Sequence, residues 1–320
     1  MSLLKVTNLS IHTTQDPRVL VNDVSFEIYP GEAVGLVGES GSGKTLSALS
    51  ILGLLPRGVA ATSGDIEFQG KLLNHIDPES MRKIRGHEIA MIYQDPMTAL
   101  NPVMKLGEQL MEVIDSHPEA GNFDIERVRE VLRDVGIPDV DRAIQSYPHE
   151  FSGGMRQRIV IAMALLLSPK LLIADEPTTA LDVTIQQQIL ALVAEERQKR
   201  KLSMLWITHD LGVVANLVDR LHVMYAGRIV ESGTVKEIFT NPRHPYTQGL
   251  ISSLPSPRGS SRAKLSSIPG VPEKPWLVGN SCAFSPRCSF VKDKCRQELP
   301  QIDVHQGHRV ACFYPLGAKL

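Results

Sequence analysis

One stretch of eight residues constrains this chain more than any other part of its sequence. It fits the pattern G-x-x-x-x-G-K-[ST] and lies between an apolar run at 33–37, which indicates a strand, and a helical run at 46–55. A chance match in a chain of this length has odds on the order of one in a hundred. The pattern predicts nucleotide binding by Gly38, Glu39, Ser40, Gly41, Ser42, Gly43, Lys44 and Thr45.

The chemistry of this loop follows from its residue types. Glycines let the backbone curl so that successive N–H groups point at phosphate oxygens, and the helix that follows adds its positive N-terminal end. We expect Lys44 to reach the β- and γ-phosphates of a nucleotide, and the Thr45 hydroxyl to ligate Mg²⁺.

Length and composition exclude several classes of protein. The 320 residues suffice for one large domain with an appendage, and 42% hydrophobic with 22% charged residues is an ordinary globular balance. A net charge of −1 gives no electrostatic reason to expect nucleic acid as a ligand. The apolar run at 159–167 is too short to span a bilayer, and the N-terminus lacks the pattern of a signal peptide.

Strand patterns occur on both sides of the loop and give way to helix patterns further along the chain. Short β-rich runs at 4–6, 24–28, 65–68 and 89–93 predict strands. A periodic block then follows, with helices predicted at 106–114 and 125–135. Gly136 and Pro138 end the second helical run. We therefore expect a helical subdomain, at about residues 95–165, inserted into an α/β domain.

A second motif begins at residue 151 with Phe-Ser-Gly-Gly-Met-Arg-Gln-Arg. Ser152 is a good N-cap for a helix predicted over 155–167. Gly153 and Gly154 would leave backbone N–H groups exposed at the helix start, which suits a phosphate. Alone this string indicates only a loop; its place after a phosphate loop makes it significant.

A third motif is an apolar strand at 171–175 that ends in two carboxylates, Asp175 and Glu176. A carboxylate at the C-terminal end of such a strand can hold Mg²⁺, and its neighbour can accept a proton from an attacking water. The alternative is a pair of carboxylates capping a strand in solvent. Asp182 then precedes a helix predicted over 183–200, and His209 follows an apolar strand at 202–208.

These motifs, in this order, resemble the nucleotide-binding subunit of an ABC transporter over roughly residues 3–240. The resemblance identifies the eight-residue loop as Walker A, Gln94 as the Q-loop glutamine, and Ser152, Gly153 and Gly154 as the ABC signature. It identifies Asp175 and Glu176 as the Walker B carboxylate and the catalytic base, Ala180 to Asp182 as the D-loop, and His209 as the switch histidine. It also implies catalytic roles for Lys44 and Gln94, and Mg²⁺ ligation by Thr45, Gln94 and Asp175.

The resemblance implies a P-loop NTPase fold of ABC type. Its parts would be an α/β RecA-like core, an antiparallel β subdomain, the inserted helical subdomain and an irregular C-terminal extension. The chain departs from the family at two positions. Met155 stands where the signature often has Gln, and Thr13 stands where an aromatic ring usually stacks on adenine, with His12 as the nearest ring.

The C-terminal part narrows the resemblance. The string at 241–247, Asn-Pro-Arg-His-Pro-Tyr-Thr, and the string at 268–272, Ile-Pro-Gly-Val-Pro, resemble the extension of oligopeptide, dipeptide and nickel importer ATPases. Residues 241–280 are rich in Pro, Gly and Ser, which predicts an extended connector wrapped over the domain. We therefore divide the chain into a nucleotide-binding domain at 1–240 and an extension at 241–320.

The four cysteines all lie in this extension, with the spacing Cys282-x5-Cys288-x6-Cys295-x16-Cys312. The spacing lacks the paired C-x2–4-C knuckles of zinc sites, whereas four thiolates on a loop-rich tail suit a [4Fe–4S] cluster. Zinc, free thiols and disulfides remain alternatives. The resemblance to dipeptide-type ATPases favours the iron–sulfur cluster.

The resemblance implies an ATP-hydrolysing subunit of an importer for di- or oligopeptides, with ATP and Mg²⁺ as cofactors. Expected partners are a paralogous ATPase subunit, two transmembrane permeases and, indirectly, an external substrate-binding protein, at the cytoplasmic face of the plasma membrane. Nickel or another small solute is the alternative cargo. Other classes are a soluble ABC ATPase acting on DNA or ribosomes, and an iron–sulfur sensor with vestigial ATPase activity.

Overall fold

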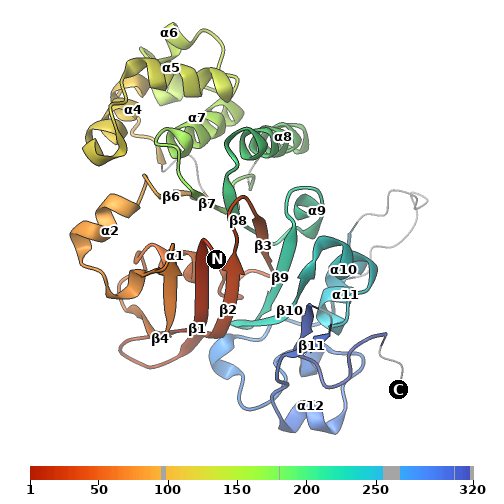
Figure 1. The fold of residues 1–320 in the computed structure, drawn as a ribbon. Coiled ribbons are helices and arrows are strands. Elements are labelled where there is room, and N and C mark those ends of the chain that lie inside the picture. Colours follow the sequence, from red (N-terminus) through yellow and green to blue (C-terminus); the bar gives the residue numbers. More distant parts are fainter. Residues whose placement is uncertain (95–98, 180, 255–266, 306, 318–320) are drawn as a thin grey trace. The chain divides into compact units, whose positions relative to one another are not determined.

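The chain folds as two compact units in a computed structural model that describes residues 1–94, 99–179, 181–254, 267–305 and 307–317 (Figure 1). The helical unit comprises Met1, 28–32 and 75–206, and the sheet unit comprises 2–27, 33–74 and 207–320. No helix in the described part of the chain combines the length and the apolar character that a membrane crossing requires. The predicted boundary between residues 240 and 241 stays a prediction.

An antiparallel sheet in the sheet unit has the order β2-β1-β4-β5. Its strands are β1 (Leu4–Thr13), β2 (Val19–Ile28), β4 (Val59–Phe68) and β5 (Lys71–Leu72). The buried residues of β1 change parity, from Leu4 and Val6 to Leu9 and Ile11, because its register with β4 shifts between Thr7 and Ser10. The intervening Asn8 has φ +51°, so the irregularity lies in the backbone itself.

A second sheet of this unit carries the phosphate loop and the C-terminal extension. Within the unit its order is β11-β12-β10-β9-β3, for strands β3 (Ala33–Val37), β9 (Arg220–Tyr225), β10 (Arg228–Thr234), β11 (Asp303–His305) and β12 (His308–Val310). β3 runs parallel to β9, and every residue of β3 is buried, as expected for a strand covered on both faces. The extension thus adds two antiparallel strands, β12 and β11, beside β10.

Helices and helical turns complete the sheet unit. They are α1 (Lys44–Ile51), η1 (Leu73–His75), α9 (Leu211–Val214), α10 (Val235–Thr240), α11 (Pro245–Ser252), η4 (Pro275–Leu277), η5 (Ser285–Arg287) and α12 (Asp293–Gln297). Residues 245–252 are therefore helical, where the composition of 241–280 predicts an extended connector, and residues 255–266 of that segment lie outside the described residues. Pro245 at the first position of α11 fits a helix start, and the His244 side chain accepts a hydrogen bond from the Tyr246 N–H.

A buried carboxylate anchors the extension to β10. Glu231 is 1% exposed, and it accepts hydrogen bonds from the backbone N–H groups of Arg243, at 2.6 Å, and His244, at 2.9 Å. Its Oε1 also lies 2.7 Å from Nε2 of His308. A buried charge requires such partners, so this contact fixes residues from both ends of the extension on one strand.

The helical unit contains β6 (Ile89–Ile92), β7 (Leu171–Asp175) and β8 (Ser203–Thr208), in the order β8-β7-β6, with β6 and β7 parallel. β8 continues into the sheet unit at Ile207. The helices of the helical unit are α2 (Pro78–Ile84), α4 (Leu106–Asp115), η2 (Pro118–Ala120), α5 (Ile125–Asp134), α6 (Val140–Ala143), η3 (Pro148–Glu150), α7 (Gly153–Leu165) and α8 (Val183–Arg200).

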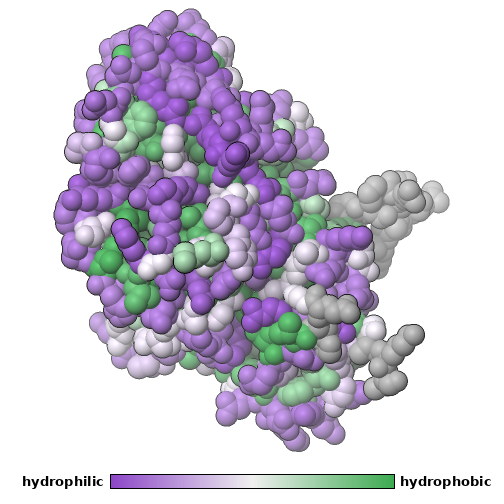
Figure 2. Space-filling model, in the orientation of Figure 1, coloured by the Kyte–Doolittle hydropathy of each residue, from purple (hydrophilic) through white to green (hydrophobic). Residues whose placement is uncertain are grey.

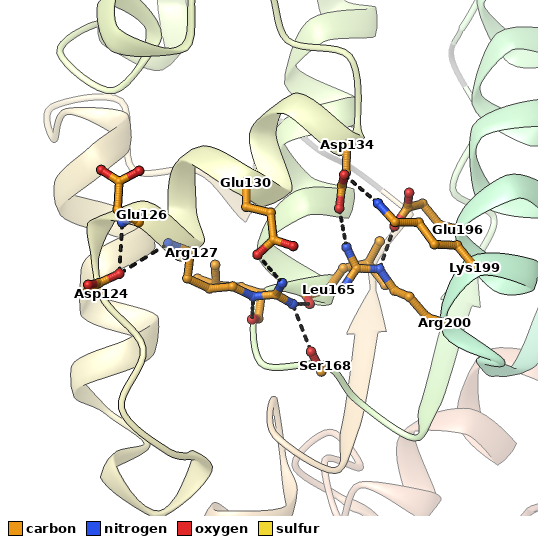
Figure 3. Close-up of polar contacts among 11 residues, drawn as sticks. Asp124, Glu126, Arg127, Glu130, Asp134, Leu165, Ser168, Glu196, Lys199 and Arg200 are labelled. Carbon is orange, nitrogen blue, oxygen red and sulfur yellow. Dashed lines mark hydrogen bonds and ion pairs between the residues drawn. The ribbon is translucent and has the colours of Figure 1, made fainter.

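Helix α5 has one apolar and one charged face. Val128, Val131 and Leu132 are buried at the spacing of a helical stripe, and the surface over α5 and α6 is mainly hydrophilic (Figure 2). Asp134 at the end of α5 pairs with Lys199 and Arg200 of α8, each at 2.6 Å (Figure 3). These ion pairs connect residues that are 65 and 66 positions apart in the sequence.

A single arginine of α5 also fixes the end of α7. Arg127 donates from Nε to the Leu166 carbonyl at 3.0 Å and from Nη2 to the Ser168 hydroxyl at 2.8 Å (Figure 3). Leu166 is the C-cap of α7, where carbonyl groups lack helical partners. The guanidinium therefore satisfies acceptors at the end of the helix that begins with the signature motif.

Candidate nucleotide site

The phosphate loop connects β3 to α1 in the sheet unit. Gly43 has φ +100°, and a Cβ atom there would lie 2.9 Å from Cγ2 of Val21. A Cβ at Gly38 would lie 2.2 Å from the backbone oxygen of Met224. Both positions therefore require glycine for lack of space. Gly41 favours glycine only through its backbone, with φ +79°, because a Cβ there would meet nothing within 4 Å. The open side of the loop at Gly41 leaves room for a ligand.

Lys44 is folded onto the loop that precedes it. Its ammonium group is 2.7 Å from the Gly38 carbonyl and 3.0 Å from the Glu39 carbonyl, and the residue is 5% exposed. Both carbonyls accept hydrogen bonds from the ammonium, which offsets the cost of burying its charge. These contacts hold the ammonium beside the loop that is expected to bind phosphate.

The two carboxylates of the third motif lie in the helical unit, where β7 ends. Asp175 is the last residue of β7 and is 3% exposed, and Glu176 follows with φ +47°. Glu176 Oε2 accepts hydrogen bonds from the Gln94 side-chain amide, at 3.3 Å, and from the Thr179 hydroxyl, at 3.0 Å. The structure therefore brings together Gln94 and Glu176, which are 82 residues apart.

The signature motif forms the N-terminus of α7, as its sequence predicts. The Ser152 hydroxyl accepts a hydrogen bond from the Met155 N–H at 3.3 Å, which is the expected N-cap contact. A Cβ at Gly154 would lie 2.8 Å from Cγ2 of Ile185 in α8, whereas a Cβ at Gly153 would meet nothing within 4 Å. Gly154 is thus needed for helix packing, and Gly153 leaves an exposed backbone.

Two further predicted residues lie at or just before the start of a helix. Asp182 caps α8, where its Oδ1 accepts a hydrogen bond from the Ile185 N–H at 2.9 Å. His209 is exposed directly after β8, and the following Asp210 caps α9 through the Gly212 N–H at 2.8 Å. Ala180 of the D-loop lies outside the described residues.

The predicted site residues divide between the two units. The phosphate loop and His209 belong to the sheet unit, whereas Gln94, Ser152–Gly154, Asp175, Glu176 and Asp182 belong to the helical unit. Within each unit the donor set fits the expected ligands. In the sheet unit the loop offers backbone N–H groups and an ammonium for phosphate, and Thr45 offers a hydroxyl for Mg²⁺. In the helical unit Gln94 and Asp175 offer oxygen atoms of the kind that Mg²⁺ prefers. The catalytic and ligand roles of these residues stay predictions.

One polar contact of the loop has no signal in the sequence. The guanidinium of Arg287, in η5 of the extension, forms an ion pair with the Glu39 carboxylate at 2.6 Å. The two residues are 248 positions apart. Neither belongs to a local pattern that would pair them, so only the fold reveals the contact.

The cysteine prediction is wrong. Cys282, Cys288, Cys295 and Cys312 are free thiols, and across the described residues no group of three or more His, Cys, Asp or Glu side chains is placed to hold a metal ion. Neither an iron–sulfur cluster nor another metal site is supported. The extension is stabilised instead by the Glu231 anchor and by the Phe284 ring, which packs against Tyr225 and Tyr246 with centroids 5.3 and 5.4 Å away.

Two of these thiols are expected to react slowly with iodoacetamide in the folded chain. Burial raises the pKa of Cys282 and Cys312 from the usual 9.0 to about 11 each, which lowers the thiolate fraction at pH 8 about 100-fold. Alkylation at each cysteine, followed by mass spectrometry between pH 7 and 11, should show rates that rise toward pH 11. Urea should restore ordinary rates, and rapid labelling of both residues at pH 8 in the folded chain would contradict the prediction.

Comparisons with known proteins agree with this fold and site. Residues 21–179 match the family described as ABC transporter, and residues 230–295 match the family described as oligopeptide/dipeptide transporter, C-terminal region. A putative peptide import ATP-binding protein of Brucella ovis is 50% identical over 92% of this chain and 91% of its own length. The dipeptide transport ATP-binding protein DppD of Escherichia coli is 46% identical over 99% of this chain and 98% of its own length.

Solved structures show the same architecture. The ABC transporter component cbiO1 of Clostridium perfringens aligns with a TM-score of 0.64 at 26% identity, over 74% of this chain and 90% of that one. The ATP-binding cassette MJ0796, solved as a dimer bound to ADP and Pi, aligns with a TM-score of 0.63 at 25% identity, over 72% of this chain and 98% of that one.

The chain therefore belongs to the ABC transporter family and is an ABC-type ATPase. Its C-terminal match and its relatives group it, within that family, with the ATP-binding subunits of oligopeptide and dipeptide transporters. The predicted family and the predicted P-loop fold of ABC type are both confirmed.

Proposed function

We propose that this chain hydrolyses ATP to power an importer of di- or oligopeptides. The proposal rests on one combination: an intact set of ATPase motifs and a C-terminal extension of the oligopeptide/dipeptide type occur in the same chain. The relatives named above are named as peptide import or dipeptide transport proteins, and this chain aligns with nearly their full length. As with other ABC ATPases of transporters, we place the chain at the cytoplasmic face of the membrane.

In the proposed reaction the phosphate loop holds the nucleotide and Glu176 accepts a proton from the attacking water. Lys44 neutralises charge that develops on the transferred phosphoryl group, where Mg²⁺ would supply further positive charge when bound, and His209 contacts the γ-phosphate. Thr45, Asp175 and Gln94 would hold the Mg²⁺. The hydrogen bond between Gln94 and Glu176 supports a role for Gln94 in orienting the base.

We also propose that two such ATPase chains close head to tail. Each nucleotide would then lie between the phosphate loop of one chain and the Ser152–Gly154 segment of its partner, with Asp182 nearby. The exposed backbone at Gly153 supports this arrangement, because its N–H groups have room to meet a phosphate. The partner is a paralogous ATPase subunit in this proposal.

A groove in the helical unit suits a permease. Its volume is about 590 Å³, and its lining combines apolar residues, among them Met91, Met104 and Met163, with polar ones such as Glu112 and His117. Methionine-rich apolar grooves accept amphipathic segments of partner proteins. Tyr93, which lines the groove, directly precedes Gln94. A permease segment seated in the groove would therefore be coupled to the residue that contacts Glu176.

The test is affinity purification from gently solubilised native membranes, with mass spectrometry of what is recovered. Wild type should recover two polytopic permeases and a second ATPase. Val113→Glu, which places a charge in the groove, should lose the permeases yet keep the second ATPase. Val103→Glu is the matched control, because Val103 is 79% exposed and is not among the residues that line the groove. Recovery of only soluble partners or ribosomes would refute the transport function.

Uptake in a strain that lacks the native gene then identifies the cargo. Complementation should restore uptake of labelled di- or oligopeptides. Restored nickel uptake without peptide uptake would refute the peptide assignment and leave the ATPase assignment intact.

A further inference from the structure

The phosphate loop is held at its second residue by the C-terminal extension. Arg287 donates from Nη1 to Glu39 Oε2 at 2.6 Å and from Nη2 to Glu39 Oε1 at 2.9 Å, so the pair is bidentate. The Glu39 backbone N–H donates to the Tyr246 hydroxyl at 2.9 Å. The extension therefore contacts both the side chain and the main chain of a single loop residue.

Arg287 is itself fixed in place. It is 7% exposed, its Nε donates to the Pro269 carbonyl at 2.9 Å, and its Nη2 is 3.4 Å from the Ile268 carbonyl. The guanidinium also lies over the Tyr225 and Phe284 rings, at 5.8 and 5.9 Å from their centroids. Such a preorganised, nearly buried arginine is suited to hold a carboxylate in one position.

The contact matters for nucleotide binding because of charge and geometry. The carbonyl of Glu39 accepts a hydrogen bond from Lys44, so a displacement of Glu39 also displaces the lysine of the loop. Without Arg287, the Glu39 carboxylate would add an uncompensated negative charge beside a loop that must accept a triphosphate. The route from Arg287 to the loop therefore runs through Glu39.

We propose that Arg287 is a positioning residue of the nucleotide site, so that ATP affinity depends on whether residues 268–288 of the extension are seated against the phosphate loop. The proposal rests on nucleotide binding by that loop. Coupling between two sites is reciprocal, so nucleotide binding must also stabilise the seated extension. The extension is then an element through which a bound partner could raise or lower ATP affinity.

The first experiment measures the Kd of ADP with Mg²⁺ by calorimetry on the full chain. Arg287→Met should raise the Kd about tenfold, as for the loss of one close charge pair. Arg296→Met is the matched control, because Arg296 lies in the same extension and its side chain is 64% exposed. The Kd of ADP for this variant should equal that of wild type. A wild-type chain that fails to bind ADP would refute nucleotide binding itself, whereas equal Kd values for wild type and Arg287→Met would refute only the positioning role.

A double-mutant cycle separates positioning from general damage to the fold. If Arg287 acts through Glu39, then Arg287→Met should change the Kd less than twofold in a Glu39→Gln background, where no carboxylate remains to neutralise. A tenfold rise in both backgrounds would show that Arg287 is only structural. In steady-state assays Arg287→Met should raise KM more than it lowers kcat.

Hydrogen exchange tests the reciprocal effect. ADP should slow the exchange of amides at 282–288 in wild type and in Arg296→Met, and should leave it unchanged in Arg287→Met. Exchange that ADP slows equally in all three proteins would contradict a coupling carried by Arg287.

Discussion

Glu176→Gln is expected to lower ATP turnover about 100-fold or more while nucleotide binding is retained. A positioned general base contributes on the order of 10² to 10⁴ in rate. The amide keeps the size of the side chain and can still accept hydrogen bonds from Gln94 and Thr179, so the local structure should survive. It cannot accept the proton of the attacking water.

The measurement is steady-state phosphate release together with the Kd of ATP, in wild type and variant. Because ATP would remain unhydrolysed, the variant should also accumulate closed dimers that size-exclusion chromatography detects. Glu195→Gln is the control, since Glu195 is an exposed carboxylate of α8 and should behave as wild type. Turnover within a factor of a few of wild type would remove Glu176 from the role of base.

Locally encoded elements were predictable to the residue. The strand at 33–37 and the strand at 171–175 match β3 and β7, because β3 is an apolar run and β7 is apolar up to Asp175, and all of their residues are buried. The helix predicted at 183–200 matches α8, since Asp182 caps its start and Lys201, in a left-handed conformation, ends it. In these segments short-range chemistry and tertiary packing specify the same structure.

Other elements depended on contacts that the sequence does not display. The helix expected at 46–55 begins earlier and ends earlier, at Lys44 and Ile51. The extension contains helix α11, whose residues Tyr246 and Thr247 are fully buried, although its composition indicates a connector. Burial against the rest of the unit outweighs a low local preference for helix.

The cysteine prediction failed for a related physical reason. Spacing along the chain and a resemblance suggested four metal ligands, but ligands must also converge in space and ionise. Across the residues that the structure describes, no group of three or more His, Cys, Asp or Glu side chains has the arrangement that holds a metal ion. The packing of Phe284 and the Glu231 anchor were not visible in the spacing, and they stabilise the segment that a metal was expected to hold.

Lys44→Ala is expected to weaken nucleotide binding about 100-fold. A charge-assisted hydrogen bond contributes about 1.5–3 kcal/mol, and the ammonium can make more than one to the β- and γ-phosphates. The substitution also removes the hydrogen bonds to the Gly38 and Glu39 carbonyls, which hold the loop in its curled form before a nucleotide arrives. Both losses act in the same direction.

Thermal melting with and without nucleotide separates these two losses. A ligand stabilises the folded state by RT ln(1 + [L]/Kd), so 1 mM ADP should raise the Tm of wild type and have little effect on Lys44→Ala. If the ligand-free Tm also falls, the loop hydrogen bonds contribute to the fold itself. Lys71→Ala is the control, because Lys71 is an exposed lysine of the same unit. An ADP-induced shift in Lys44→Ala equal to that of wild type would show that the loop binds phosphate through its backbone N–H groups alone.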